Sequence, residues 1–330
     1  MTTLMATEAR ESAQRIAEQL SHNATLAAML GERIRKLKPR LVMMVGRGSS
    51  DHAGVFAKYL IEIETGVPVC AAAPSVTSVY GRQLQLKDAL VLVISQSGRS
   101  PDILAQAEAA KAAGAMVLAL VNDERSPLAE LADAVLPLKA GPETAVAATK
   151  SYLCTLSAIA QLVAAWTRNK ELEQALTALP QVLDKVCKGQ PQLRLDDLKA
   201  LRHGIVLGRG LGYAISRELA LKLKEVCGIQ AEAFSSAEFL HGPVTLASRP
   251  LTVIELQVDD ESAANHQAQI ADVEGRGAKV LHLKVEEAVH PRLAPLCLLQ
   301  RFYLDIAEVA VQLGLNPDAP AGLNKVTRTL

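Results

Sequence analysis

Short, unbroken runs of apolar residues alternate with longer, more polar stretches over the first half of the chain. The runs consist of β-branched and aliphatic residues, a composition typical of strands buried on both faces of a parallel sheet. The intervening stretches have helical composition, and the one over residues 102–113 is followed by Gly114, which suits a helix C-terminus. This alternation predicts a doubly wound parallel sheet. The expected strands are residues 41–45, 67–73, 89–94, 116–121 and 134–138.

The remaining segments have helical composition until the alternation begins again near residue 200. Residues 8–37 predict one or two helices, and residues 144–170 predict another. Pro180 interrupts the polar, helical connector that follows. We therefore expect a helical amino-terminal segment (1–38), a phosphate-binding domain (39–170), a helical connector (171–199), a second domain (200–285) and a carboxy-terminal helix with an active-site tail (286–330).

Two short motifs recur in the second half of the chain at nearly the same separation. The sequence VGRGSS at residues 45–50 returns as LGRGLG at residues 207–212, and a glycine-containing stretch around Gly114 returns around Gly277. Two matches at one separation indicate a duplicated domain. The same separation pairs residues 95–97, which are Ser-Gln-Ser, with residues 258–260, which are Val-Asp-Asp. Because carboxylates repel a phosphate, only the first half is expected to hold one.

The predicted strand 89–94 leads directly into hydroxyl and amide side chains, with Ser100-Pro101 suited to an N-cap and a first helical position. A helix N-terminus with several hydroxyl donors is a favourable site for phosphate. The turn after the first strand carries Asp51 where a dinucleotide-binding turn has glycine, so a nicotinamide site is not expected. Residues 95–100, called here the serine loop, follow another strand of the same sheet. Ser49 and Ser50 should lie close to this loop, because parallel strands place their ligands at their carboxyl ends.

Two features of the second half suggest acid–base chemistry. Glu218, Lys222 and Glu225 share one face of a predicted helix, although their spacing alone slightly favours a surface stripe of ion pairs. His241 precedes Gly-Pro at an expected chain reversal, where an imidazole could reach a cleft and act as a general acid or base.

Length, charge and cysteine content narrow the class of protein. A chain of 330 residues exceeds one typical domain. Its 35 basic and 35 acidic residues give no net charge, which argues against nucleic acid or an anionic membrane as a partner. The five scattered cysteines suit reduced thiols in a cytoplasmic protein rather than a zinc site. Neither a signal peptide nor a membrane-spanning segment is expected.

The motifs together resemble those of the SIS (sugar isomerase) family. Nearly the whole chain is similar to the isomerase portion of glutamine–fructose-6-phosphate aminotransferase, and this resemblance implies two tandem doubly wound, flavodoxin-like, parallel-sheet SIS domains with a helical amino-terminal segment and a carboxy-terminal tail. The matching stretches are residues 48–50, 95–98, 140–150, 220–225, 231–233, 241–243 and 318–325.

The resemblance also implies roles for individual residues. Glu225 would move a proton between C1 and C2 of the sugar, His241 would open the ring in the neighbouring subunit of a homodimer, and Lys222 would lie beside Glu225. Lys325 matches a tail lysine that forms an imine with a ketose in the aminotransferase. The residues expected to bind the sugar phosphate are Ser49, Ser50, Ser95, Gln96, Ser97, Ser100, Glu143 and, through its backbone, Val146. No metal and no organic cofactor are expected.

The chain departs from the aminotransferase because only about 40 residues precede the first predicted strand, none of them cysteine, so no glutaminase domain is expected. The resemblance to the family also shows four changed positions, Arg99, Ser100, Leu240 and Ala321. Together these departures resemble stand-alone, SIS-type amino-sugar-phosphate deaminases, and they predict a glucosamine-6-phosphate deaminase that yields fructose 6-phosphate and ammonia. Alternatives are a galactosamine-6-phosphate deaminase, a deglycase of a 6-phosphorylated fructosamine, an isomerase that uses free ammonia, and a non-catalytic sugar-phosphate sensor.

Overall fold

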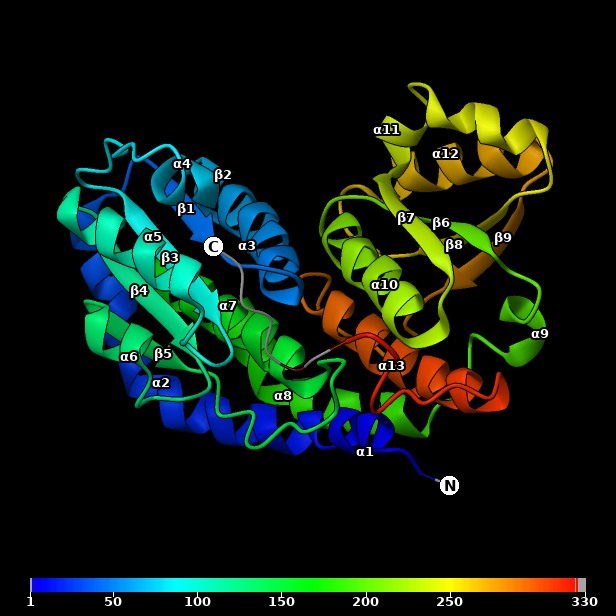
Figure 1. The fold of residues 1–330 in the computed structure, drawn as a ribbon, viewed down its shortest axis with the longest axis horizontal. Coiled ribbons are helices and arrows are strands. Elements are labelled where there is room, and N and C mark those ends of the chain that lie inside the picture. Colours follow the sequence, from blue (N-terminus) through cyan, green and yellow to red (C-terminus); the bar gives the residue numbers. More distant parts are fainter. Residues whose placement is uncertain (1, 324, 326–330) are drawn as a thin grey trace. The chain divides into compact units, whose positions relative to one another are not determined.

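The computed structural model describes residues 2–323 and 325, and these form two compact units (Figure 1). The first-sheet unit comprises Gln14–Glu143 and Lys150–Thr177. The second-sheet unit comprises residues 2–13, Thr144–Thr149 and 178–325. Each unit contains one parallel sheet, so the predicted pair of doubly wound domains is confirmed.

The first sheet has the strand order β2-β1-β3-β4-β5, with every pair parallel. This is the flavodoxin-like order, and each strand lies within two residues of its expected position. The strands β3 and β4 are buried along their whole length, as their continuous apolar runs predict. The strands are β1 (Val42–Val45), β2 (Val69–Ala71), β3 (Leu90–Ser95), β4 (Met116–Val121) and β5 (Ala134–Pro137).

Helices cover both faces of this sheet (Figure 1). Alternate residues of β3 and β4 pack in one apolar cluster with Ile103, Ala107 and Leu128 from α5 and α6. Helix α3 contacts β1 and β3 and packs against α7. The helices are α2 (Ser12–Leu37), α3 (Ser49–Thr65), α4 (Pro74–Ser78), α5 (Pro101–Ala112), α6 (Pro127–Leu131), α7 (Lys150–Thr167) and the start of α8 (Lys170–Lys188).

The second sheet has the order β7-β6-β8-β9, again all parallel, which repeats the order of the first four strands of the first sheet. Its strands are β6 (His203–Gly208), β7 (Gln230–Ser235), β8 (Thr252–Leu256) and β9 (Lys279–Leu283). The helices of this unit are α1 (Leu4–Arg10), the end of α8, α9 (Leu195–Leu198), α10 (Leu211–Cys227), α11 (Ser236–Phe239), the 3-10 helix η1 (Pro243–Ser248), α12 (Ala263–Gly275) and α13 (Ala294–Gln312).

The repeated glycine turns have the same conformation in both units. Gly48 and Gly210 are the N-caps of α3 and α10, and both have φ of 54°. A Cβ on Gly46 would lie 2.8 Å from backbone atoms of Ser50, and one on Gly208 would lie 2.4 Å from the backbone of Gly212. The duplication inferred from the sequence is therefore present in the backbone.

The predicted helix over residues 144–170 begins only at Lys150. The backbone N–H groups of Thr144 and Ala145 donate to the carboxylate of Glu8, at 2.5 and 3.2 Å. The N–H of Val146 donates to the carbonyl oxygen of Asp318 at 2.9 Å. These long-range bonds hold residues 144–149 in a non-helical path, so local helical composition does not determine their structure.

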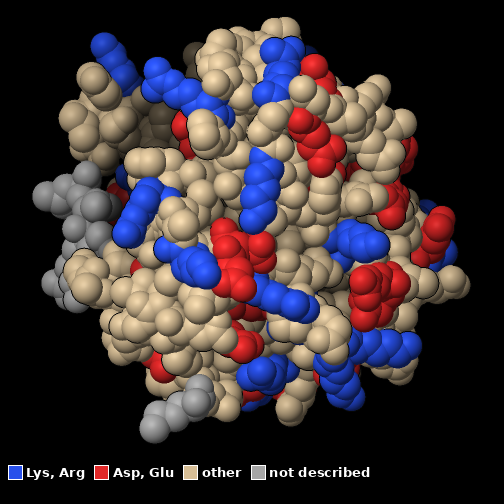
Figure 2. All heavy atoms as spheres, turned by 90° about the vertical axis from the view of Figure 1, so that its right-hand side faces the viewer, with Lys and Arg blue, Asp and Glu red and all other residues tan. Residues whose placement is uncertain are grey.

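Basic and acidic side chains are interspersed on the face shown in Figure 2. Among the residues that the structure describes, no helix is both long enough and apolar enough to cross a bilayer. All five cysteines are thiols without disulfide bonds, and burial raises the pKa of Cys227 and of Cys297 to about 12.

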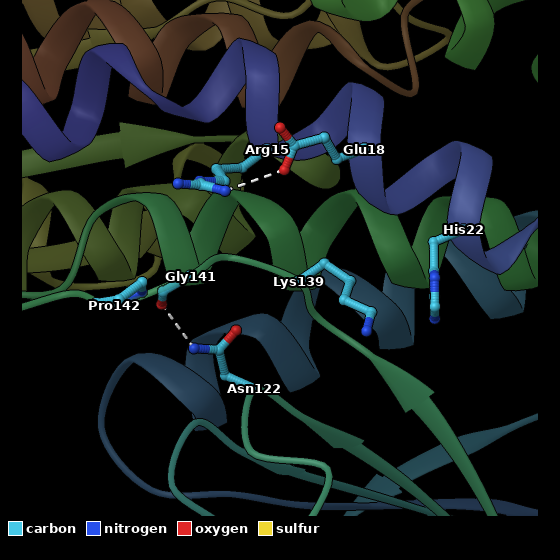
Figure 3. Close-up of a pocket in the computed structure, with 7 residues that line it drawn as sticks. All are labelled: Arg15, Glu18, His22, Asn122, Lys139, Gly141 and Pro142. Carbon is cyan, nitrogen blue, oxygen red and sulfur yellow. Dashed lines mark hydrogen bonds and ion pairs between the residues drawn. The ribbon is translucent and has the colours of Figure 1, made fainter.

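A polar pocket of about 510 Å³ lies in the first-sheet unit, between α2 and the segment that follows β5 (Figure 3). Arg15 pairs with Glu18 at 3.0 Å, and Asn122 donates to the carbonyl oxygen of Gly141 at 2.8 Å. The site residues predicted from the sequence do not line this pocket. Its lining residues are Arg15, Glu18, His22, Asn122, Lys139, Gly141 and Pro142.

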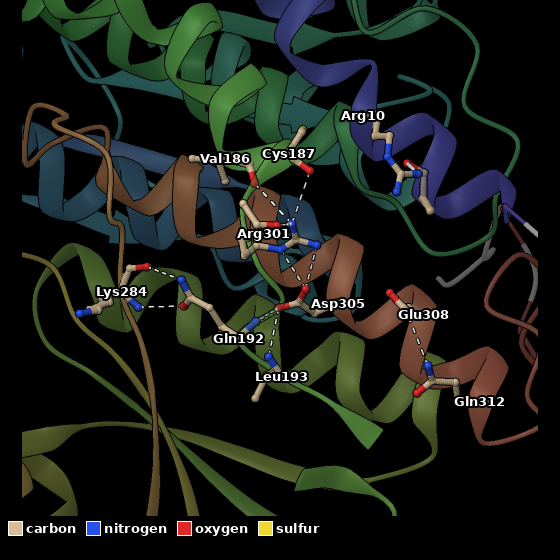
Figure 4. A network of polar contacts seen from close by, with 12 residues as sticks. Arg10, Val186, Cys187, Gln192, Leu193, Lys284, Arg301, Asp305, Glu308 and Gln312 are labelled. Carbon is tan, nitrogen blue, oxygen red and sulfur yellow. Dashed lines mark hydrogen bonds and ion pairs between the residues drawn. The ribbon is translucent and has the colours of Figure 1, made fainter. Parts of the chain in front are cut away.

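A buried carboxylate anchors the connector of the second-sheet unit to α13 (Figure 4). Asp305 accepts hydrogen bonds from the backbone N–H groups of Gln192 and Leu193, at 2.8 and 3.1 Å. Arg301 donates to Asp305 at 2.8 Å and to the carbonyl oxygen of Gly189 at 2.9 Å. The connector therefore has a defined path because one ion pair satisfies its backbone groups.

Replacement of this anchor should destabilise the protein. We expect Asp305→Ala to lower the free energy of unfolding by about 2–4 kcal/mol, because it leaves two N–H groups and a guanidinium without their acceptor. Glu308→Ala is the matched control, since Glu308 is exposed and accepts a hydrogen bond from Gln312 on the same helix, at 3.2 Å. Urea denaturation measures both, and equal stability of the two variants would contradict this role of Asp305.

Candidate active site

The serine loop after β3 carries most of the predicted phosphate-binding side chains, and hydrogen bonds to its backbone hold its shape. The hydroxyl of Ser95 accepts a hydrogen bond from the N–H of Gly98 at 3.1 Å. The carbonyl oxygen of Gln96 accepts from the N–H of Asn122 at 3.1 Å. Gly98 has φ of 62°, and a Cβ there would lie 2.2 Å from the hydroxyl of Ser126. The loop therefore has a preformed shape that only glycine permits at this position.

Ser100 occupies the N-cap position of α5, and Pro101 is its first helical residue, as predicted. The Ser100 side chain accepts no hydrogen bond from the backbone of the helix. Ser100, Gln96 and Ser97 are half-buried at this end of α5. An anion here would meet hydroxyl and amide donors together with the positive end of a helix dipole.

The first two residues of α3, Ser49 and Ser50, follow β1, which is the neighbour of β3 in the sheet. Arg47 in the same turn pairs with Asp102 of α5, with Nε 2.8 Å from the carboxylate. Asp102 is buried, whereas half of the Arg47 side chain is exposed. This ion pair joins the turn after β1 to the start of α5. Arg47 also adds a positive charge at this end of the sheet. It belongs to the motif at residues 45–50, but the sequence pattern alone did not indicate a role for it in the site.

Glu218, Lys222 and Glu225 form a buried charge cluster on α10 in the second-sheet unit. The Lys222 ammonium lies 3.2 Å from a carboxylate oxygen of Glu218 and 2.7 Å from one of Glu225. The side chains of Glu218 and Lys222 are 0% and 2% exposed, so the interpretation as a surface stripe is wrong. Burial alone would lower the pKa of Lys222, but the two carboxylates outweigh it and raise the pKa above its usual value.

Glu225 is the member of this cluster that can reach a ligand, since 20% of its side chain is exposed. The Lys222 ammonium forms an ion pair with the carboxylate of Glu225, and this carboxylate could accept a proton from a substrate. The fully buried Glu218 in turn provides a second carboxylate for Lys222. The cluster therefore has the composition of a general base with a positioned cation.

His241 lies at the chain reversal that its sequence context predicts. It follows α11, and its backbone N–H donates to the carbonyl oxygen of Glu238 at 3.0 Å. His241 is exposed. Gly242 has φ of 150°, and Pro243 begins η1. The imidazole is thus presented on a sharp turn.

The tail residue Lys325 donates to the carbonyl oxygen of Ala145 at 2.6 Å, next to Val146. The Val146 N–H donates to the carbonyl oxygen of Asp318 at 2.9 Å, and the contact of its backbone with a substrate stays a prediction. Asn324 of the tail motif lies outside the described residues.

Glu143 belongs to the first-sheet unit, where its carboxylate accepts hydrogen bonds from the N–H and hydroxyl of Ser151, at 3.1 and 2.5 Å. The residue is 7% exposed, and these bonds hold the start of α7. Its contact with a substrate stays a prediction, as do the roles of the other site residues. Within the described part of the chain, no three His, Cys, Asp or Glu side chains are grouped as metal ligands.

The sequence model of the SIS domain family matches residues 37–165 and 198–285. The chain belongs to the SIS family. Its first SIS match contains β1, β3 and the serine loop, and its second contains α10 and His241.

The chain is similar to glutamine–fructose-6-phosphate aminotransferase of Brucella abortus, with 34% identity over 246 residues that cover 71% of this chain and 40% of that protein. It is also similar to the Thermotoga maritima aminotransferase, with 31% identity over 86% of this chain and 51% of the relative. This SIS protein therefore spans about half the length of the curated relatives it matches, or less.

Solved structures share the fold along nearly the whole chain. A candidate phosphosugar isomerase from Silicibacter pomeroyi has a TM-score of 0.90 and 35% identity, and covers 96% of this chain and 100% of its own. The carboxy-terminal domain of the Francisella tularensis aminotransferase has a TM-score of 0.85 and 25% identity, with coverage of 97% and 99%. The Thermotoga maritima glucosamine-6-phosphate deaminase, at 21% identity and a TM-score of 0.79, shares the fold over 99% and 100% of the two chains.

Loss of the Lys222 charge should make the stability of this SIS protein depend on pH. In Lys222→Met the buried carboxyl of Glu218 loses this cation, so its pKa rises above the unfolded value. The variant therefore loses no stability through this group below the ordinary pKa of a glutamate, and the loss grows by up to about 1.4 kcal/mol per pH unit above it until the buried carboxyl ionises. Denaturation curves at several pH values measure the effect. Lys224→Met, at an exposed position of the same helix, is the control. A pH-independent loss in Lys222→Met would disprove the charge argument.

Proposed function

We propose that this SIS protein is a glucosamine-6-phosphate deaminase. It isomerises the aldose to a ketose, releases ammonia and yields fructose 6-phosphate. The observation that supports this best is the cluster on α10, in which the partly exposed Glu225 lies 2.7 Å from a buried ammonium. A base of this kind suits proton transfer between neighbouring carbons, which is the central step of an aldose–ketose isomerisation.

The proposal assigns phosphate binding to the loop after β3 and the turn after β1. Ser95, Gln96, Ser97 and Ser100 would bind the phosphate oxygens, with Ser49 and Ser50. A preformed loop suits this task because little conformational entropy is lost on binding. The phosphate contributes binding energy at a distance from the reacting carbons, which holds C1 and C2 in place.

In the proposed reaction His241 opens the pyranose ring by moving a proton to the ring oxygen. Glu225 removes the proton from C2 of the open-chain aldehyde, giving an enaminol, and returns a proton to C1. The product is an imine at C2, which water hydrolyses to the ketone and ammonia. Glucosamine 6-phosphate and one water thus become fructose 6-phosphate and one ammonia.

Two further assignments follow the same proposal. Lys325 need not form an imine, because the substrate brings its own nitrogen, and an electrostatic or structural role agrees with its bond to Ala145. We also propose a homodimer in which His241 serves the site of the neighbouring subunit, and its exposure in the single chain is compatible with this role.

Ammonia release from a panel of phosphorylated amino sugars tests the proposed function. We expect rapid release from glucosamine 6-phosphate with equal formation of fructose 6-phosphate. Release only from galactosamine 6-phosphate or fructoselysine 6-phosphate would keep the mechanism but change the substrate. Saturable binding without release from any of them would overturn the deaminase proposal in favour of a sugar-phosphate sensor or an ammonia-using isomerase.

Glu225→Gln should remove the base and lower kcat by about 10²- to 10⁴-fold, with KM little changed. Steady-state kinetics on the active substrate measure this. Lys224→Met serves as the control on the same helix. A variant Glu225→Gln with near wild-type kcat would show that another group moves the proton.

Ser97→Ala should act on binding instead of chemistry. Loss of one hydrogen bond to a charged phosphate should raise KM about tenfold and change kcat by less than about threefold. Ser248→Ala removes an exposed hydroxyl that bonds only the carbonyl oxygen of Thr245, at 2.7 Å, and should have no effect. A selective loss of kcat in Ser97→Ala would contradict the phosphate-binding role.

A further inference from the structure

A chain of buried polar side chains connects α11 to α12 and β8 in the second-sheet unit. The Ser236 hydroxyl, on a residue only 1% exposed, donates to the amide oxygen of Gln269 at 2.5 Å. Because that hydroxyl hydrogen is used, the Nδ1 atom of His266, 2.8 Å from the same oxygen, is the donor in the second contact. Ser236 is therefore held by two residues of α12.

A buried carboxylate lies beside the His266 ring. Its Nε2 atom lies 3.3 Å from one carboxylate oxygen of Glu255 on β8, and both residues are 2% exposed. The other oxygen of Glu255 contacts Nδ1 of His282 on β9. His282 in turn lies 3.2 Å from Glu274 of α12. Burial acts to raise the pKa of Glu255, but the two imidazoles outweigh it and leave the pKa below its usual value.

These contacts set the position of a very short helix. Ser236 is the first residue of α11, which ends at Phe239, a fully buried residue whose ring lies 5.7 Å from that of Phe234. Directly after it, the N–H of His241 bonds the carbonyl oxygen of Glu238 at 3.0 Å, which continues the helical turn. A helix of this length has little intrinsic stability, so its position depends on its two anchors, Ser236 and Phe239.

We infer that Ser236 and His266 are positioning residues for His241. The inference rests on the proposed function, in which His241 opens the sugar ring. The side chains act through α11: His266 and Gln269 hold Ser236, and Ser236 fixes the turn that presents His241. They take no part in the transfer of the proton between C2 and C1, which belongs to Glu225 on α10.

A pair of reactions separates ring opening from proton transfer. Glucosamine 6-phosphate requires both steps. By contrast, 5-deoxyfructose 6-phosphate cannot close a ring, and in the presence of ammonium, which re-forms the imine at C2, exchange of its C1 hydrogen with D₂O requires the base but no ring opening. We expect Ser236→Ala and His266→Gln to lower kcat for glucosamine 6-phosphate about five- to tenfold, the effect of about one hydrogen bond, with KM unchanged. Their rates of C1 exchange should stay within about twofold of wild type.

Ser157→Ala is the matched control, because Ser157 is also buried and its hydroxyl also donates to a buried glutamine amide oxygen, that of Gln19. Thermal melts of all variants check folding. We expect this control to lose comparable stability but to keep both rates. Equal losses of the two rates in Ser236→Ala and His266→Gln, or no loss of kcat in either, would overturn the inference.

The variant His241→Gln separates failure of this inference from failure of the proposed function. It should lose turnover of glucosamine 6-phosphate and keep C1 exchange. If it does so while Ser236→Ala and His266→Gln match wild type, the positioning inference is wrong and the role of His241 stands. If His241→Gln keeps full turnover, the ring-opening assignment itself is wrong, and the inference fails with it.

Discussion

The architecture of both units depends on how closely the first strand of each sheet approaches the helix that follows it. At Gly46 and at Gly208 an added Cβ would lie within 2.8 Å of backbone atoms four residues ahead. Glycine alone permits this approach, and the next glycine of each turn takes φ of 54° to start the helix. The junction directs the N-terminus of α3 or α10 toward the carboxyl end of its sheet, where parallel folds place their ligands. The positions of Ser49 and Ser50 follow from it.

The same scaffold has different side chains at its two strand ends. After β3 the chain presents Ser95, Gln96 and Ser97, whereas the corresponding loop after β8 contains Asp259 and Asp260. Asp260 accepts from the N–H and hydroxyl of Ser262, at 2.8 and 2.6 Å. A carboxylate thus occupies the loop position where the first unit has hydroxyl donors. This difference supports the proposal that the first sheet, and not the second, binds phosphate.

The sequence was a good guide wherever local pattern and tertiary structure agree. The apolar runs predicted every strand of the first sheet, because such runs are stable only when helices cover both faces. The serine loop, the N-cap position of Ser100 and the duplication were also evident, since each depends on residues adjacent in the chain. The SIS membership rested on the order of these motifs and is confirmed by the family match.

Features that depend on distant partners could not be predicted in this way. Residues 144–149 are not helical because Glu8 and Asp318 bind the N–H groups of residues 144–146. Spacing placed Glu218 and Lys222 on one face of a helix, but only the packing of α10 shows that this face is buried. The contacts of Ser236 with α12 join residues about thirty positions apart, and no local sequence pattern predicts them.

The central claim is that Glu225, beside a buried ammonium, moves a proton between C2 and C1 of a phosphorylated amino sugar. The most direct measurement is conversion of glucosamine 6-phosphate in D₂O, with the fructose 6-phosphate product analysed by NMR at C1. The account predicts solvent deuterium at C1, on one face only, from the wild-type protein and almost no conversion by Glu225→Gln. Product without deuterium that is formed at the same rate by both proteins would contradict it.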